Sequence, residues 1–397
     1  MTRAVVIAYP QALSFSGQTA ATVLALRELR ARGWDCKSVE FTALDRSKPA
    51  LTRNFVFVAG VILAWLRMIR AATQGAPVIV FNHGQSLASF LRMGPLHLGL
   101  RALLPRRAIV TSLHGSVFLG WAPDSRNMRI FLRLLRASDR ITVLGETQRA
   151  GLIALGIAAE QLVLMPNTAD LALADPKGIQ SRHQALADDP LAPIVILHLS
   201  LLIESKGYPA FLDACLALAT APDRPARPLE IKLVGPMAFT GYCTRFTTPE
   251  AKSDWINARI AALNSLPDVT AKWIPGAEGT QKQTLFDDAH IFVFPSRFPV
   301  EAQPLVLLEA MASGCAIVAS DQGEIAATVG NDTGYCLSDV GVPALVTALR
   351  SLIVDHDLRL HAASAGRARA ETVFGSTAYG KNWDRMLTGL QTKGAVA

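Results

Sequence analysis

Closely spaced cysteines are missing from this sequence of 397 residues. The chain has five cysteines, an odd number, and no two of them form a Cys-x-x-Cys pair. We therefore expect neither a disulfide framework nor a zinc site, and the pattern fits a reducing compartment such as the cytoplasm. The cysteines are Cys36, Cys215, Cys243, Cys315 and Cys336.

The chain also lacks an evident secretion signal and a long apolar segment. A strand-like run, Ala4–Ala8, stands where a signal peptide would have a charged start, an apolar block and a cleavage site. The longest apolar run, Phe55–Leu66, is shorter than the ~20 residues that a helix needs to span a bilayer core. The sequence therefore predicts a cytoplasmic protein, with peripheral binding to the inner face of the plasma membrane as an open alternative.

The motifs of several other nucleotide-binding enzymes are absent. No Gly-x-Gly-x-x-Gly follows the first strand, which argues against a nicotinamide oxidoreductase, and no Gly-x4-Gly-Lys-Ser/Thr loop is present to cradle a phosphate. No cluster of metal-ligand residues is evident, so we expect neither a metal nor another cofactor.

The net charge of +7 is unevenly distributed. Residues 1–175 contain 20 Lys/Arg and 10 Asp/Glu, whereas the remainder contains 19 and 22. A basic first half is typical of proteins that meet an anionic lipid surface, a phosphorylated acceptor or a nucleic acid. Nucleic acid is not expected, because the arginines lack the interleaved aromatic residues of a single-strand platform.

Short apolar strand candidates alternate with helical patterns along the whole chain. Strands separated by helices indicate parallel sheets, and runs such as Ile291–Phe294, apolar on both faces, fit strands that helices cover on each side. With a length typical of two domains, the sequence predicts an α/β protein of two Rossmann-like, doubly wound domains. The strand candidates are 4–8, 36–41, 78–82, 108–113, 140–144, 162–165, 194–199, 230–234, 269–274, 291–294 and 316–319.

One segment, Thr168–Pro193, interrupts this alternation. It is rich in Ala, Asp, Pro and Gly, and we interpret it as a linker with the domain boundary near residue 180. The predicted domains are therefore 1–180 and 181–376. Because ligands bind beyond the carboxyl ends of parallel strands, we expect a ligand in a cleft where the two domains face each other.

The most informative segment runs from Phe294 to Gly314. A buried strand ends at Phe294, a loop follows, Pro304 suits the first turn of a helix, and Gly314 suits its end. The helix is apolar except for Glu309, which either lies on a solvated face or accepts the two hydroxyls of a ribose. Glu301 lies just before the same helix, whose first amides suit phosphate or sugar oxygens.

This segment resembles the Glu-x7-Glu signature of the retaining GT-B glycosyltransferases of family 4, typified by sucrose, mannosyl and bacterial polysaccharide transferases. The matching residues are Pro295-Ser296, Glu301-Ala302-Gln303-Pro304 and Leu308-Glu309-Ala310-Met311-Ala312-Ser313-Gly314. The resemblance implies a GT-B fold in which Glu301 is catalytic and contacts the donor sugar, while Glu309 holds the ribose. It also implies that the amides near Ala302–Leu305, a stretch that includes Gln303 and Pro304, reach donor oxygens. Ala302 replaces the usual glycine, which we interpret as a tuning change.

The resemblance extends over nearly the whole chain. The segment His198–Gly207 is similar to a strand and loop that end in Lys-Gly, which makes Lys206 a catalytic ligand of the donor diphosphate. Many members carry a polar or basic residue near Leu201, and this chain does not.

Gly235 matches a glycine turn beneath the nucleotide base. Lys282 matches the region that cradles the base, although a solvated helix charge is the slightly favoured alternative. Gly323-Glu324 and Gly334-Tyr335 match loop positions with structural roles.

Further candidates lie in the N-terminal half. His114 ends a strand, and the resemblance makes it a catalytic contact of the donor sugar, although a lone histidine is more often structural. Gly17 belongs to Ser14–Gln18, which is placed like the family's glycine-rich first loop near the phosphates. His83 and Gln85 follow another strand and are predicted to line the acceptor side. A helix at about 377–397 is expected to pack back onto the N-terminal domain.

The predicted reaction is a metal-independent hexosyl transfer from a UDP- or GDP-sugar, with retention at the anomeric carbon. The expected acceptor is a glycan or a polyprenyl-diphosphate-linked intermediate of exopolysaccharide, capsule or lipopolysaccharide synthesis. Two apolar stretches edged with arginines, Phe55–Arg70 and Ala88–Arg107, are either core helices or a surface for an anionic membrane.

The sequence leaves two other functions open. Ala302 and Leu201 suggest a nucleotide-sugar-binding relative with impaired catalysis and a non-enzymatic role. A nucleotide-sugar epimerase on the same two-domain plan is a further alternative, which the Glu301/Glu309 spacing disfavours.

Overall fold

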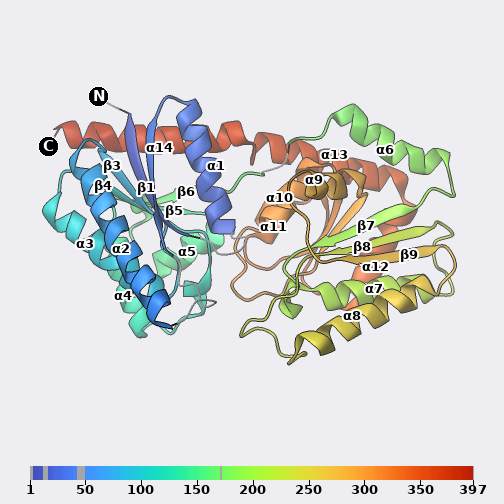
Figure 1. Ribbon diagram of the computed structural model, residues 1–397. Helices are drawn as coiled ribbons and strands as arrows, with labels where there is room; N and C mark the ends of the chain where they lie inside the picture. The colour runs from blue at the N-terminus through green and yellow to red at the C-terminus, as the bar shows by residue number, and fades with distance from the viewer. Residues whose placement is uncertain (1–2, 12–16, 43–49, 170–171, 397) are drawn as a thin grey trace. The chain divides into compact units, whose positions relative to one another are not determined.

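The computed structural model describes residues 3–11, 17–42, 50–169 and 172–396, and the chain divides into two compact units (Figure 1). The N-terminal unit consists of Met1–Thr168 and Gly375–Ala397, and the C-terminal unit of Ala169–Phe374. Within the described residues each unit contains one six-stranded sheet, and all strand pairs are parallel. The predicted fold class, two Rossmann-like α/β domains, is therefore confirmed.

The sheet of the N-terminal unit has the strand order β2-β1-β3-β4-β5-β6, with β1 between β2 and β3. Its strands are β1 (Ala4–Pro10), β2 (Asp35–Phe41), β3 (Val78–Phe81), β4 (Ala108–Ser112), β5 (Arg140–Val143) and β6 (Leu162–Leu164). Its helices are α1 (Gly17–Ala31), α2 (Ala50–Thr73), α3 (Leu87–Leu103), η1 (Val117–Gly120), α4 (Arg126–Arg136), α5 (Glu146–Ala154), η2 (Ala159–Gln161) and α14 (Ser376–Val396).

The sheet of the C-terminal unit has the order β12-β11-β10-β7-β8-β9, so the direction of winding reverses between β10 and β7. Its strands are β7 (Ile194–Leu199), β8 (Leu229–Val234), β9 (Val269–Ile274), β10 (Ile291–Phe294), β11 (Ala316–Ser320) and β12 (Gly334–Leu337). Its helices are α6 (Pro176–Asp188), η3 (Glu204–Lys206), α7 (Tyr208–Thr220), α8 (Pro249–Asn264), α9 (Gly279–Asp288), α10 (Leu305–Ala312), α11 (Ile325–Val329), α12 (Val342–Val354) and α13 (His356–Thr372).

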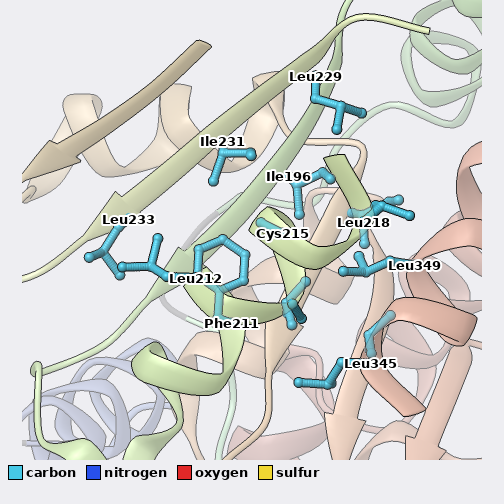
Figure 2. Packing of buried hydrophobic residues seen from close by; sticks show 14 of the residues in the cluster. Ile196, Phe211, Leu212, Cys215, Leu218, Leu229, Ile231, Leu233, Leu345 and Leu349 are labelled. Atoms are coloured by element: carbon cyan, nitrogen blue, oxygen red, sulfur yellow. The ribbon is translucent and has the colours of Figure 1, made fainter. Parts of the chain in front are cut away.

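The core of the C-terminal unit shows why α7 is apolar along most of its length. Phe211, Leu212, Cys215 and Leu218 of α7 are fully buried between the sheet and α12, whose Leu349 packs in the same cluster (Figure 2). This packing covers one face of the sheet. The loops that follow β7 and β10 therefore start from a rigid base.

Two elements differ from the sequence interpretation. The supposed linker Thr168–Pro193 contains helix α6, which Asp175 caps and whose Ile179 and His183 are buried in the C-terminal unit. The boundary thus falls between Thr168 and Ala169, not near residue 180. Gly334-Tyr335, interpreted as a loop, begins strand β12 at the edge of the sheet. Its residues are only partly buried, so no apolar run marked it.

The other end of the chain belongs to the N-terminal unit. Helix α14 buries Tyr379, Trp383 and Leu387 in the same cluster as Leu24 of α1 and the strands of that unit. The Nε1 of Trp34 also donates a hydrogen bond to Asp384 Oδ1 at 2.8 Å.

Helix α3 is a core helix, because Phe90, Met93 and Leu100 are buried on it and Arg101 pairs with Asp139. The membrane-surface alternative for Ala88–Arg107 is therefore wrong for most of that helix.

Two buried histidines make the stability of the C-terminal unit depend on pH. His183 and His290 lie edge to face, with ring centroids 5.4 Å apart. Burial lowers the pKa of His183 from 6.5 to about 3, and burial together with His183 and Arg182 lowers that of His290 to about 2. Both rings are neutral in the folded state above these values. Below about pH 6.5 only the unfolded chain binds these protons, so stability falls as the pH falls from that point.

We predict that His183→Gln flattens this acid loss of stability. Glutamine can still donate to the Gly314 carbonyl that His183 Nε2 contacts at 3.2 Å, but it takes up no proton on unfolding. Between pH 6 and 4 the unfolding free energy of the wild type should fall with each pH unit by about 1.4 kcal/mol more than that of the variant. Denaturant titrations at several pH values measure it, and equal slopes in both proteins would contradict the prediction.

Candidate functional site

Glu301 and Lys206 form a buried ion pair where the winding of the C-terminal sheet reverses. Glu301 follows β10, Lys206 follows β7, and these strands are neighbours. Lys206 Nζ donates to Glu301 Oε2 at 3.0 Å and to Oε1 at 3.3 Å, and Ser296 Oγ donates to Oε2 at 2.8 Å. Glu301 is 7% exposed, so these donors replace the water that its carboxylate has lost.

Two glycines allow the backbones around this pair to approach closely. Gly207 has a φ of 90°, and a Cβ there would lie 2.3 Å from the carbonyl oxygen of Pro295. Gly323 has a φ of 60°, and a Cβ there would lie 2.3 Å from the carbonyl oxygen of Glu301. A side chain at either position would push the Glu301 loop away. Gly323 therefore has the structural role that the sequence predicts.

A second ion pair joins Glu309 to Lys282. Glu309 lies on α10 and is 1% exposed, and its Oε1 accepts a hydrogen bond from Lys282 Nζ of α9. The Lys282 side chain is itself 13% exposed. The alternatives that placed these two charges on solvated helix faces are wrong, because the cost of burying each charge is reduced by the other.

Gly235 lies at the end of β8 in a backbone conformation that suits only glycine. Its φ is 141°, and a Cβ there would lie 1.7 Å from the carbonyl oxygen of Ser200. Trp273 Nε1 donates to the Gly235 carbonyl at 3.1 Å, which fixes an indole ring beside the turn. A flat base could lie on such a glycine turn, as the resemblance implies.

The start of α10 offers backbone amides rather than side chains. Ala302, Gln303 and Leu305 are all less than 10% exposed, and Gln303 Nε2 donates to Thr328 Oγ1 at 3.2 Å. Pro304 is the N-cap residue and has no N–H to donate. The amide of Leu307 donates to the Pro304 carbonyl at 3.2 Å, so the amides of Leu305 and Val306 are the first-turn donors that a ligand can use.

His114 and Gln85 lie together in the N-terminal unit. His114 follows β4, and its Nε2 lies 3.2 Å from Ser112 Oγ. Burial lowers the pKa of His114 to about 4, so the imidazole is neutral at pH 7. Gln85 accepts from the amide of Phe118 at 2.9 Å and donates to the Gly115 carbonyl. Gln85 thus braces the loop that carries His114.

His83 is placed differently from what the sequence predicts, whereas the prediction for Gly17 concerns a loop that lies largely outside the described residues. His83 is 2% exposed, its Nε2 lies 3.0 Å from His97 Nδ1, and burial lowers its pKa to about 3. A ring packed in this way does not line a surface, so the acceptor-side assignment of His83 is not supported. Gly17 is the exposed first residue of α1, and residues 12–16 of its loop lie outside the described residues.

Several contacts near the first ion pair escaped the sequence interpretation. Lys206 Nζ lies 4.9 Å from the ring centroid of Phe298, which in turn meets the Tyr242 ring edge to face at 5.0 Å. Fully buried Lys252 donates to the carbonyls of Leu202 and Ala238 at 3.0 and 2.9 Å and pairs with Glu204. It ties the loops after β7 and β8 together.

No group of three or more His, Cys, Asp or Glu residues suited to a metal ion occurs among the residues that the structure describes. The sequence Asp355-His356-Asp357 belongs to a helix start, because the Asp355 carboxylate accepts from the amide of Leu358 at 2.9 Å.

The chain is similar in fold to several proteins of known structure. Residues 190–369, which include both ion pairs, match the family model of the group 1 glycosyl transferases. The fold is similar to Anabaena HepE in complex with UDP-glucose, with a TM-score of 0.66 and 17% identity over 97% of this chain and 99% of that one. It is also similar to sucrose-phosphate synthase from Thermosynechococcus elongatus, with a TM-score of 0.69 and 18% identity over 98% and 100%.

The lipopolysaccharide outer core galactosyltransferase WaaB gives a TM-score of 0.63 and 14% identity, over 97% of this chain and 99% of that one. A comparison with curated protein sequences found no match. The fold is that of the GT-B glycosyltransferases, as predicted. The match to the group 1 glycosyl transferase model lies within the C-terminal unit.

We predict that the Lys206–Glu301 pair is strongly coupled in stability. Lys206→Met leaves a buried carboxylate whose remaining side-chain donor among the described residues is Ser296, and it should destabilise the protein by about 3 kcal/mol. Glu301→Gln in the same chain removes the uncompensated charge and should restore about half of that loss. Denaturant titration of the single and double variants measures the coupling, and strictly additive effects would contradict it.

Proposed function

We propose that this protein is a retaining glycosyltransferase, which moves a hexose from a UDP- or GDP-sugar to a glycan or lipid-linked acceptor. The observation that carries the proposal is the pair of buried carboxylate–lysine contacts at the carboxyl ends of the C-terminal sheet. Carboxylates accept from sugar hydroxyls and ammonium groups bind phosphate, so the same few side chains suit both ends of a nucleotide sugar.

Glu309 is proposed to hold the ribose of the donor. A carboxylate can accept from two neighbouring hydroxyls at once, and a buried one loses little further hydration when a ligand arrives. Lys282 orients this carboxylate, because its Nζ contacts Oε1. The turn at Gly235, with the Trp273 indole beside it, is proposed to take the base.

Lys206 is proposed to bind the diphosphate and Glu301 the hexose. These two side chains neutralise each other. A diphosphate brings negative oxygens to Lys206, so Lys206 shifts part of its bonding to the phosphate and Glu301 accepts from the sugar hydroxyls instead. The first amides of α10 add further donors without needing a metal ion.

In the proposed reaction the bond between the anomeric carbon and the phosphate oxygen breaks, and the acceptor oxygen bonds to that carbon on the same face. The acceptor proton passes to the departing phosphate oxygen, and the nucleotide diphosphate leaves. Lys206 stabilises the charge that develops on the diphosphate. Neutral His114 is proposed as a donor-sugar contact from the N-terminal unit.

The proposed acceptor is an intermediate of exopolysaccharide, capsule or lipopolysaccharide synthesis, and the proposed location is the cytoplasm. The basic first half of the chain supports an anionic or phosphorylated partner, and one similar structure is a lipopolysaccharide galactosyltransferase. Gln85 is proposed to act on the acceptor side through its contact with the His114 loop.

A nucleotide-sugar-binding relative without transferase activity is the second candidate. It is supported by the Ala302 methyl group beside the α10 amides and by Leu201, which is 39% exposed where a polar side chain could meet phosphate. An assay of UDP-glucose and GDP-mannose turnover, with and without lipid-linked acceptors, separates the two. Donor binding with no turnover under any condition would favour this second candidate.

We predict that replacing Glu309 chiefly weakens nucleotide binding, whereas replacing Glu301 chiefly slows turnover. Glu309→Gln should weaken UDP binding by about tenfold, because an amide accepts fewer hydroxyl hydrogen bonds than a carboxylate. Glu301→Gln should leave UDP binding within about threefold but lower kcat by about 100-fold. Calorimetry measures binding, and nucleotide release measures turnover.

Glu250→Ala, an exposed carboxylate at the start of α8, is the control and should change neither quantity. Wild-type binding and turnover in both Gln variants would refute the assignment of these roles.

A further inference from the structure

Helix α2 of the N-terminal unit exposes a large apolar face. The expectation that the apolar segment around Phe55–Leu66 is too short to span a bilayer is wrong for the whole helix. Thr52–Thr73 is long and apolar enough to cross a membrane by length and composition alone, yet only 22% of its most apolar stretch is buried. Phe55, Ile62 and Leu66 recur on one side of the helix and are 75%, 53% and 59% exposed. A soluble protein rarely leaves so many large apolar side chains together in water, so this face calls for a partner.

The opposite side of α2 is anchored in the N-terminal unit. Ala64, Met68, Ala71 and Ala72 are buried against the sheet in one cluster with Phe41. The Nε1 of Trp65 also donates to the Arg92 carbonyl of α3 at 2.8 Å. Crossing a bilayer would strip these contacts from the sheet, so α2 stays on the unit and offers only its outer side.

The charges on α2 all have one sign. The helix carries Arg53, Arg67 and Arg70 and no Asp or Glu. Arg67 and Arg70 are exposed and lie near the C-terminal end of the apolar face, beside Leu66 and Ile69. Large apolar side chains bordered by arginines fit the boundary between the acyl chains and the anionic head groups of a bilayer. A second copy of the chain would bring arginines against arginines.

We propose that the outer face of α2 docks the protein on the surface of an anionic phospholipid bilayer, with Phe55, Ile62 and Leu66 inserted among the acyl chains. Arg67 and Arg70 bind the lipid phosphates. The helix lies in the plane of the membrane and does not span it. This inference is independent of the donor site, because it uses no residue that binds the nucleotide sugar.

The test is co-sedimentation of the full chain with vesicles of phosphatidylcholine alone and of equimolar phosphatidylcholine and phosphatidylglycerol. The wild-type protein should bind the anionic vesicles and bind the neutral ones at least tenfold more weakly. The variant Phe55→Gln/Ile62→Gln/Leu66→Gln should bind the anionic vesicles about 100-fold more weakly. Arg67→Gln/Arg70→Gln should lower binding to anionic vesicles about tenfold and reduce its dependence on salt.

A matched control removes apolar side chains elsewhere. Leu103, Leu191 and Val354 are 78%, 79% and 69% exposed and do not lie on α2. Replacing all three by Gln should leave vesicle binding unchanged. UDP binding should be the same in every variant, which shows that the C-terminal site is intact and that any loss concerns the membrane alone.

Three results would overturn the proposal. The first is that the wild-type protein does not bind anionic vesicles. The second is that the triple α2 variant binds them as tightly as the wild type does. The third is that light scattering finds the wild type as a dimer and only the triple α2 variant as a monomer. Should the triple variant fail to fold, Phe55→Trp serves instead. Brominated acyl chains should quench the fluorescence of the tryptophan introduced by Phe55→Trp. If the fraction of fluorescence quenched is the same in the wild type and the variant, insertion is contradicted.

Discussion

A buried carboxylate needs a buried cation, and the candidate site of this protein depends on that constraint twice. Lys206 and Glu301 come from loops after two neighbouring strands, and Lys282 and Glu309 come from two helices, so each pair joins segments that are far apart in the chain. Removing one partner leaves an uncompensated charge in a site of low dielectric. The pairs therefore hold the loops in place as well as providing the groups that meet a ligand.

The same constraint explains how the proposed donor could enter without a large rearrangement. Each lysine has several N–H groups, and each carboxylate has several acceptor positions. The hydroxyls and phosphate oxygens of a nucleotide sugar can therefore replace some of the hydrogen bonds within each pair. Backbone contacts limit how far the loops can move. Gly207, Gly235 and Gly323 each bring a backbone carbonyl closer than any side chain would permit, so the ligand meets a preformed surface.

Much of the fold could be predicted from the sequence, because buried parallel strands read as apolar runs that are easy to see. Every predicted strand is present, whereas β12 was missed because it lies half-exposed at an edge. The polar composition around α6 concealed a helix whose buried stripe consists of only a few residues, Ile179 and His183 among them.

The site was harder to predict, because its geometry depends on contacts between distant segments. The Glu301–Glu309 spacing was visible, but nothing in the sequence near Lys282 indicates that it meets Glu309. His83 looked like an acceptor ligand because it follows a strand, yet its ring packs against Phe81 and His97 in the core, and those two rings also stack on each other. A position at a strand end predicts closeness to a site, and only the packing decides which way a side chain faces.

The most direct measurement is a crystal structure of the protein soaked with UDP-glucose. The account predicts the ribose hydroxyls within hydrogen-bond distance of the Glu309 carboxylate, the diphosphate against Lys206, and the hexose against Glu301. A nucleotide bound elsewhere, or one that leaves both lysine–glutamate pairs untouched, would contradict it.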